Sequence, residues 1–392
     1  MKIDPYKHKE RYIKWKESAM EKGIPDISKY DSDIILQYVN DMENGVNVAS
    51  SSVKGARSYV RLNTLHQKLR FFALKFQELY NLSKITEISE DRLCCFFSDM
   101  RKGVIRKQNG QPYQSTAYFV KNFKSFWHWW MKINRKQGIE IRDITLDLDT
   151  KTDKPRWVYL SENQIKKLCN NSLFKYKVLI MFLFDTGIRS PTELMNIKVS
   201  DLYNGYKELH IREEVSKTFG RKIKLMLCSS LIKEFIENEG LEKDEYLFQI
   251  DPRAVNQHLK RLGKKILGDR ESLAGQKYSE LTMYDFRHCS CCYWLLRYKS
   301  ESALKFRFGW KKSDKIHYYS EMLGMKDTIC EDDMLVDVTK TELENRLQKS
   351  ESERLILQER VAHMENQMKE MSELFLKVKQ GILEVLPLKQ FE

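Results

Sequence analysis

The stretch KYKVLIMFLFDTGIRSPTELMNIKVSDL (residues 175–202) decides the fold of the larger part of this chain. Its apolar run, residues 178–184, predicts a buried helix over about 175–185, which ends where Thr186 and Gly187 break the pattern. Two short alternating segments follow, ELHIREEV (208–215) and RKIKLML (221–227), and the intervening SKTFG predicts a β-hairpin. Helical patterns resume from about 253 to 294. The sequence therefore predicts a mainly α domain with a small β-sheet over residues 158–330.

A separate, all-helical domain is predicted for residues 31–145, after a charged and weakly patterned N-terminal extension (1–30). Its apolar residues recur three or four positions apart, as on one face of a helix. Ser115 is expected to cap the second of these helices, and its aromatic stripe is interpreted as core rather than as a base-stacking surface. The polar segment LDLDTKTDKPRW (146–157) predicts a linker. The two apolar faces consist of Leu62, Leu65, Leu69, Phe72, Phe76 and Leu79, and of Phe119, Phe123, Phe126 and Trp130.

The segment 335–385 has a heptad-like pattern, with spacings that alternate between four and three residues. The pattern indicates a coiled coil, which we expect to join protomers. A long amphipathic helix folded back onto the chain is the alternative. The two polar interruptions could set register or the number of partners. The seam positions are Leu343, Leu347, Ser350, Arg354, Leu357, Val361, Met364, Met368, Met371, Phe375, Val378 and Ile382.

The chain has a formal net charge of +13, which suits a polyanionic partner, either nucleic acid or an acidic membrane face. The run at 178–184 is too short to span a bilayer, and the eight Cys match no zinc-site spacing. The N-terminus MKIDPYKHKERYIKW shows no secretory pattern, so we expect a cytoplasmic protein without a membrane partner. The candidates for contacts with nucleic-acid phosphates are Arg106, Lys107, Lys121, Lys124, Arg221, Lys311 and Lys312.

Four stretches of the larger domain hold polar groups that could act together: DTGIRSPTELMNIKVSDL (185–202), VSKTFGRKIKL (215–225), LTMYDFRHCSCCYWL (281–295) and RFGWKKSDKIHYYSEM (307–322). Two arginines, a lysine and a tyrosine among them could bind a phosphodiester and attack it. Guanidinium groups stay charged and donate in a bidentate fork to the nonbridging oxygens. A phenol must lose its proton to attack, and a lysine can protonate the departing 5′ oxygen. We expect this chemistry to need neither a metal nor another cofactor.

The order of these motifs resembles the catalytic half of tyrosine recombinases, the family of phage and archaeal integrases, Xer recombinases and Cre. Thr-Gly-x-Arg (186–189) is followed by a hairpin lysine, then Arg-His (287–288), Gly-Trp (309–310) and a tyrosine. The resemblance covers residues 155–325, and more weakly the helical region before the linker. It implies that Arg189 and Arg287 clamp the scissile phosphate, Lys217 is the general acid, Trp310 donates to a phosphate oxygen and Tyr319 is the nucleophile.

Several of these assignments have competitors. Tyr318 lies beside Tyr319, and the resemblance of Ile-His-Tyr-Tyr-Ser to the family's Ile-Tyr-Thr-His favours Tyr319. Arg221, Lys222 and Lys224 compete with Lys217. We expect His288 to be a buried structural residue rather than a direct participant.

Two positions depart from the family pattern. Tyr284, counted among the candidate catalytic residues, stands where the family has the His of His-x-x-Arg. It can hydrogen-bond a phosphate oxygen but cannot act as a base or a cation near neutral pH. The family often has Glu three residues after its first arginine. Here that residue is Thr192, and an orienting role for Glu193 depends on where the following helix begins.

The resemblance implies a site-specific recombinase or integrase that cleaves and reseals double-stranded DNA through a 3′-phosphotyrosyl intermediate, to integrate or excise a mobile element. It also implies tetramers on two DNA sites, with the coiled coil pre-pairing protomers as dimers. A type IB topoisomerase would use the same chemistry without exchange between duplexes. A non-catalytic DNA-binding protein on the same scaffold would bind duplexes without cutting them. A mainly structural coiled-coil protein would bind protein partners and show no salt-sensitive affinity for DNA.

Overall fold

The computed structural model describes residues 2–46, 55–152, 154–298 and 300–323, together with scattered positions between 347 and 372. By its internal contacts the chain divides into residues 1–323 and 324–392. The first unit has two separate hydrophobic cores, one formed by residues 12–148 and the other by residues 157–319. Among the described residues, no helix is long and apolar enough to cross a membrane.

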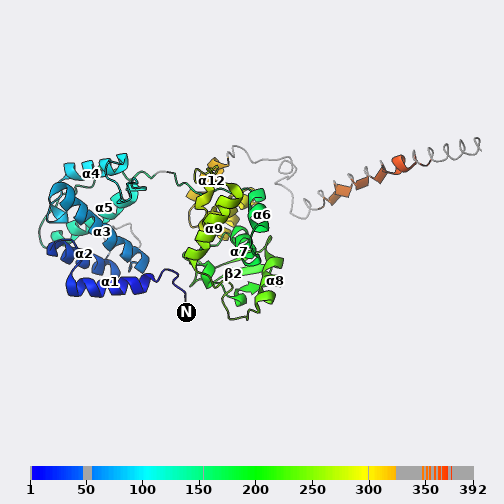
Figure 1. Cartoon of the computed structure of the whole chain (residues 1–392), viewed down its shortest axis with the longest axis horizontal. Coiled ribbons are helices and arrows are strands. Elements are labelled where there is room, and N and C mark those ends of the chain that lie inside the picture. Colours follow the sequence, from blue (N-terminus) through cyan, green and yellow to red (C-terminus); the bar gives the residue numbers. More distant parts are fainter. Residues whose placement is uncertain are drawn as a thin grey trace, which may run out of the picture. The chain divides into compact units, whose positions relative to one another are not determined.

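Helices enclose the first core (Figure 1). Their apolar faces are largely the predicted ones, since Leu62, Leu69, Phe72, Phe123 and their neighbours are buried, although Leu79 is 45% exposed. The core also starts earlier than residue 31, because α1 packs against α3 and buries Tyr12 and Ala19. The elements are α1 (His8–Lys22), α2 (Lys29–Glu43), α3 (Tyr59–Tyr80), the 3-10 helix η1 (Ile85–Glu87), α4 (Glu90–Lys102) and α5 (Thr116–Arg135).

Local sequence signals explain where several of these helices begin and end. The side chains of Ser28 and Ser89 accept hydrogen bonds from first-turn amides of α2 and α4. Gly103, in the left-handed conformation with φ 76°, ends α4. Ser115 immediately precedes α5, as predicted, but its φ of 60° gives it no capping hydrogen bond. The start of this helix was therefore predicted correctly and its capping chemistry was not.

The second core lies among helices and one small sheet, the green to yellow part of Figure 1. The predicted helix over 175–185 is confirmed as α7, which is buried along most of its length. The helices of this part are α6 (Glu162–Asn170), α7 (Phe174–Thr186), the 3-10 helices η2 (Leu194–Asn196), η3 (Val199–Asp201) and η4 (Tyr278–Glu280), and α8 (Ser229–Glu239), α9 (Pro252–Leu267), α10 (Met283–Leu295), α11 (Glu301–Phe308) and α12 (Asp314–Met322).

The predicted hairpin is present within a three-stranded antiparallel sheet, in the order β1 (Leu202–Tyr203), β2 (Glu208–Ile211) and β3 (Arg221–Lys224). Its register pairs Ile211 with Arg221 and Glu208 with Lys224. Both strands are shorter than predicted. After Ile211 the chain turns, because the Arg212 carbonyl accepts from the amides of Val215 and Ser216. Residues 212–220 therefore form a loop, named here the lysine loop because it carries Lys217.

The end of α7 is brought close to the end of α11. Gly187 ends α7 with φ 57°, and a Cβ at this position would overlap the ring of Phe308. No other residue type fits there without displacing that ring. Since α7 also packs against α10, the ends of α7 and α11 lie beside α10, whose Ser290 Oγ would be 2.9 Å from that Cβ.

In the C-terminal unit, the described positions between 347 and 372 are helical. Seam positions Leu347, Leu357, Val361, Met364 and Met368 lie on this helix and are exposed. Other positions of the predicted seam, among them Leu343, Met371, Phe375, Val378 and Ile382, lie outside the described residues.

Candidate active site

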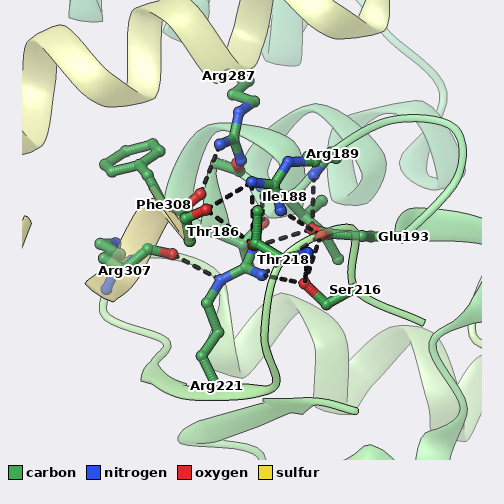
Figure 2. A network of polar contacts seen from close by, with 12 residues as sticks. Thr186, Ile188, Arg189, Glu193, Ser216, Thr218, Arg221, Arg287, Arg307 and Phe308 are labelled. Atoms are coloured by element: carbon green, nitrogen blue, oxygen red, sulfur yellow. Dashed lines mark hydrogen bonds and ion pairs between the residues drawn. The ribbon is translucent and has the colours of Figure 1, made fainter. Parts of the chain in front are cut away.

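Arg189 and Arg287 come together from distant parts of the sequence. Arg189 follows α7, and Arg287 lies in the second turn of α10. Arg287 donates hydrogen bonds to the carbonyls of Gly187 and Phe308, the latter at 2.6 Å. Arg189 donates to the Gly309 carbonyl at 2.6 Å. Figure 2 shows both guanidinium groups directed toward this group of carbonyl oxygens. Burial, followed by the charge of Arg189, lowers the pKa of Arg287 to about 10, so it remains a cation at neutral pH.

Glu193 is the anion that holds this arginine cluster. It is completely buried and accepts from Arg189 Nη1 at 2.6 Å and from Arg221 Nη2 at 2.9 Å. Burial alone raises the pKa of Glu193, but the hydrogen bond and charge of Arg221 and the charge of Arg189 lower it to about 2. The carboxylate is thus ionised. A helical turn, in which the Glu193 amide donates to the Arg189 carbonyl at 2.8 Å, brings it under Arg189.

Arg221 is an internal cation and not the surface DNA contact expected from the sequence. It is 2% exposed, and its Nε donates to the Arg307 carbonyl at 2.9 Å. It is the first residue of β3, where Arg221 and Ile223 face inward while Lys222 and Lys224 face outward. This strand alternation was a signal available in the sequence, because Arg221 shares the face of Ile223.

Lys217 is exposed in the lysine loop, and both of its neighbours are attached to the arginine cluster. Ser216 Oγ donates to Glu193 at 3.2 Å, and Thr218 Oγ1 donates to the Gly309 carbonyl at 2.9 Å. The same carbonyl accepts from Arg189. Gly309 has φ +60°, and a Cβ there would lie 3.0 Å from Arg221 Nη1 and 3.1 Å from Thr218 Oγ1. A glycine thus permits the loop to approach the arginines (Figure 2).

Tyr319 lies on α12, is 3% exposed and stacks on Trp310. The two ring centroids are 6.0 Å apart with an interplanar angle of 9°. Trp310 in turn stacks on Phe308 and faces the Arg287 guanidinium at 6.0 Å. Trp310 therefore stands between Arg287 and Tyr319. Burial raises the pKa of Tyr319 well above its ordinary value, although the charge of Arg287 opposes this rise.

Tyr318 is directed toward the end of the predicted linker. Its hydroxyl accepts from Trp157 Nε1 at 2.7 Å and donates to the Pro155 carbonyl at 2.9 Å. Burial raises the pKa of Tyr318 as well. The two adjacent tyrosines thus have different partners.

His288 lies at the hydroxyl of Tyr319, a contact that the sequence interpretation missed. Its Nδ1 is hydrogen-bonded to the Tyr319 hydroxyl, and its ring stacks on Trp157 with 4.8 Å between centroids. Tyr284 lies one turn earlier on α10, is 49% exposed and meets the His288 ring edge-on at 5.1 Å. The available signal was the position of His288, next to Arg287 and four residues after Tyr284.

The remaining basic candidates differ in their surroundings. Arg106 donates to the carbonyls of Gly103 and Gly110, and Lys124 donates to that of Thr145 at 2.6 Å. These two side chains stabilise their own loops as they stand. Lys107, Lys121, Lys311 and Lys312 are exposed, and the last two directly follow Trp310.

Two fixed guanidinium cations thus lie where α7 and α11 end, with the buried Tyr319 of α12 stacked on Trp310 and the exposed Lys217 on a loop attached to the arginine cluster. Such a set can bind a phosphodiester anion and supply both a nucleophile and an acid for its cleavage.

Comparisons with known proteins give one family match and several structures of similar fold. Residues 158–323 match the model of the phage integrase family, and no curated protein sequence matches the chain significantly. Similar solved structures include the Tn1549 transposon integrase in complex with transposon right end DNA, at 15% identity and a TM-score of 0.53, covering 83% of this chain and 98% of that one.

Two further structures have the same fold. A lambda integrase dimer bound to a COC′ core site has 14% identity and a TM-score of 0.54, covering 76% of this chain and 79% of that one. The XerH site-specific recombinase bound to palindromic difH substrate has 14% identity and a TM-score of 0.51, covering 76% and 94%. At these identities the likeness is one of fold.

Proposed function

We propose that the chain is a tyrosine-type site-specific DNA recombinase with Tyr319 as its nucleophile, because residues 158–323 match the model of the phage integrase family. It cuts a strand by forming a 3′-phosphotyrosyl bond and rejoins that strand to a 5′ hydroxyl, its own or that of a partner duplex. Its partner is double-stranded DNA. The solved integrases and the recombinase that share its fold are bound to DNA.

The observation that carries this proposal is the convergence of Arg189 and Arg287 next to Tyr319. The two guanidinium groups donate to neighbouring carbonyls, those of Gly309 and Phe308. Trp310 contacts both the Arg287 guanidinium and the Tyr319 ring. A phosphodiester bound beside these carbonyls would meet two cations whose positions Glu193 and the backbone already fix.

The reaction follows from the chemistry of these groups. Arg189 and Arg287 stabilise the charge that develops on the nonbridging oxygens. The Tyr319 oxygen attacks phosphorus, and Lys217 protonates the departing 5′ oxygen. The phosphotyrosyl bond conserves the energy of the broken phosphodiester, so a free 5′ hydroxyl can reverse the step and reseal the strand.

Beyond the active site, we assign residues 31–145, with α1, to the second arm of a DNA clamp. The exposed Lys107 and Lys121 are its candidate phosphate contacts. The C-terminal segment pairs protomers through its apolar seam, and four protomers act on two DNA sites. Exchange between duplexes needs paired protomers, so the seam favours a recombinase over a type IB topoisomerase.

The nucleophile is tested by trapping the covalent intermediate. A library of nicked duplexes with randomised sequence is incubated with the full chain, and complexes stable to detergent are selected. The nick releases a short strand on cleavage, which prevents resealing. We expect adducts with the wild type and with the matched control Tyr318→Phe, and a loss of at least about a thousandfold with Tyr319→Phe.

Each outcome points to a different function or nucleophile. Adducts that persist in Tyr319→Phe and vanish in Tyr318→Phe would move the nucleophile to Tyr318. A wild type that binds DNA but gives no adduct with any duplex would indicate a non-catalytic protein. Strand transfer between two labelled duplexes distinguishes a recombinase from a topoisomerase, which reseals only the strand that it cut.

A further inference from the structure

The contact between His288 and Tyr319 supports a role beyond structure for this histidine, provided that the proposed function holds. The imidazole is held on three sides, by the Trp157 ring at 4.8 Å, the Tyr284 ring at 5.1 Å and the Tyr319 ring at 5.7 Å between centroids. Its Nδ1 contacts the Tyr319 hydroxyl. Stacking on Trp157 restricts the plane of the imidazole.

Tyr319 needs a proton acceptor at this site. The phenol is 3% exposed, and its burial raises the pKa of the hydroxyl, so it does not ionise unaided near neutral pH. Burial also raises the pKa of the nearby Cys291 and Cys292, so these thiols keep their protons. Tyr284 is itself a phenol and accepts no proton at neutral pH. An imidazole is the side chain suited to this task.

We propose that His288 is the general base for Tyr319 and performs the proton transfer that Tyr284 cannot. The neutral imidazole carries its proton on Nε2 and accepts the phenolic proton on Nδ1 as the bond between Tyr319 Oη and phosphorus forms. The bond between phosphorus and the 5′ oxygen breaks, and that oxygen takes a proton from Lys217. In resealing, His288 returns its proton to the departing phenol and Lys217 receives one from the attacking 5′ hydroxyl.

The same hydrogen bond has an opposite interpretation, in which His288 only restrains Tyr319 away from DNA. The two interpretations predict opposite changes in the cleavage rate when His288 is replaced. A base that is removed slows cleavage, and a restraint that is removed speeds it. They also differ in what restores a lost rate, because a missing base is compensated by a more acidic nucleophile.

The experiment measures single-turnover adduct formation by the full chain on the selected nicked duplex. One version of the duplex carries sulfur in place of the 5′ bridging oxygen, because a thiolate leaves without being protonated. In a parallel set of proteins, Tyr319 is replaced by 3,5-difluorotyrosine, a more acidic phenol. The variants are His288→Gln, His288→Asn and Lys217→Ala, with Lys233→Ala, an exposed lysine of α8, as the control for Lys217.

We expect His288→Gln and His288→Asn to slow adduct formation by about 10²–10⁴-fold, because an amide can hydrogen-bond but cannot take the proton. Difluorotyrosine restores most of the rate in these variants and not in Lys217→Ala. Sulfur at the 5′ bridging position restores the rate of Lys217→Ala and not that of the His288 variants. The conclusion depends on rescue of the rate, which a misfolded protein would not show. The two His288 variants serve as checks on each other if one of them disturbs the packing.

A wild-type or faster rate in both His288 variants would overturn the proposal, and so would a loss that sulfur but not difluorotyrosine restores. These results leave the proposed function intact as long as the wild type forms its adduct. Absence of any wild-type adduct would instead contradict the proposed function itself.

Discussion

At the scale of single residues, Glu193 is the group on which the arginine cluster depends. Its carboxylate is the ion-pair partner of both Arg189 and Arg221, and both members of the pair with Arg221 are buried. Desolvating a carboxylate and a guanidinium costs several kcal/mol per ion, so a buried pair of this kind adds little net stability. Removing one member alone strongly lowers the stability of the fold, because the other charge stays buried without its partner.

We therefore predict that Glu193→Gln lowers the free energy of unfolding by about 3–5 kcal/mol, as measured by urea denaturation. Glutamine keeps the shape and accepts a hydrogen bond, but it supplies no charge to Arg221. The matched control is Glu237→Gln, an exposed partner of Lys233 at 3.9 Å, with an expected change below about 0.5 kcal/mol. Equal effects of the two substitutions would contradict the assigned role of Glu193.

The pKa of Glu193 also predicts how this difference depends on pH. The folded-state pKa is about 2, below the ordinary value of 4.5, so the stabilisation is fully present above about pH 4.5. It is lost as the pH falls from 4.5 toward 2, where the folded protein must also take up the proton. The gap in unfolding free energy between the wild type and Glu193→Gln should therefore shrink over this range. A gap that stays constant between pH 6 and 3 would show that the charge of Glu193 is not its cause.

At the scale of elements, the lysine loop is held by side chains on both sides of Lys217. Ser216 bonds to Glu193 and Thr218 to the Gly309 carbonyl. A loop lysine is flexible in itself and loses side-chain entropy when it is positioned. Attachment of its neighbours reduces the region that the ammonium group must search, which favours protonation of the leaving oxygen.

We predict that Thr218→Val slows single-turnover cleavage by about 10-fold to 100-fold, because the loop loses its bond to Gly309. Thr218→Ser, which keeps the hydroxyl, is expected to retain the rate. The affinity for DNA should change little. Sulfur at the 5′ bridging position should reduce the defect, since the lysine is then not needed. A Thr218→Val defect that is unaffected by sulfur would place the role of Thr218 elsewhere.

At the scale of the whole molecule, the C-terminal helix presents apolar side chains that gain from a partner. Leu357 is 60% exposed and Met368 is 67% exposed. Fully burying a side chain of this size contributes about 1.5–3 kcal/mol. A second copy of the same heptad seam is the partner that the pattern favours.

We predict that Leu357→Glu combined with Met364→Glu shifts the full chain from dimer to monomer, as measured by light scattering. Cleavage of the nicked duplex should persist, because the active site lies within residues 158–323, while strand transfer between two duplexes falls. Glu365→Gln, at an exposed position beside the seam, is the control. A wild type that is monomeric at the assay concentration, or a double variant that stays dimeric, would contradict pairing through this segment.

Local patterns in the sequence determined much of this protein. The apolar run at 178–184, the break at Gly187 and the alternation around SKTFG predicted α7 and the hairpin of the sheet, because the periods of helices and strands are properties of neighbouring residues. The resemblance to tyrosine recombinases, through the order of its motifs, identified Arg189, Lys217, Arg287, Trp310 and Tyr319 as the site candidates. The lengths of the strands and the extent of the first core were predicted less well.

Only the tertiary structure decided which polar groups meet. Arg221 is turned inward to Glu193, Thr218 reaches Gly309, and His288 contacts Tyr319. These partners lie 28, 91 and 31 residues apart in the sequence. Hydrogen bonds at such separations are set by how α7, α10, α11 and α12 pack. A hydrophobic pattern determines that a helix is buried on one face, but not which polar side chain of another element lies opposite.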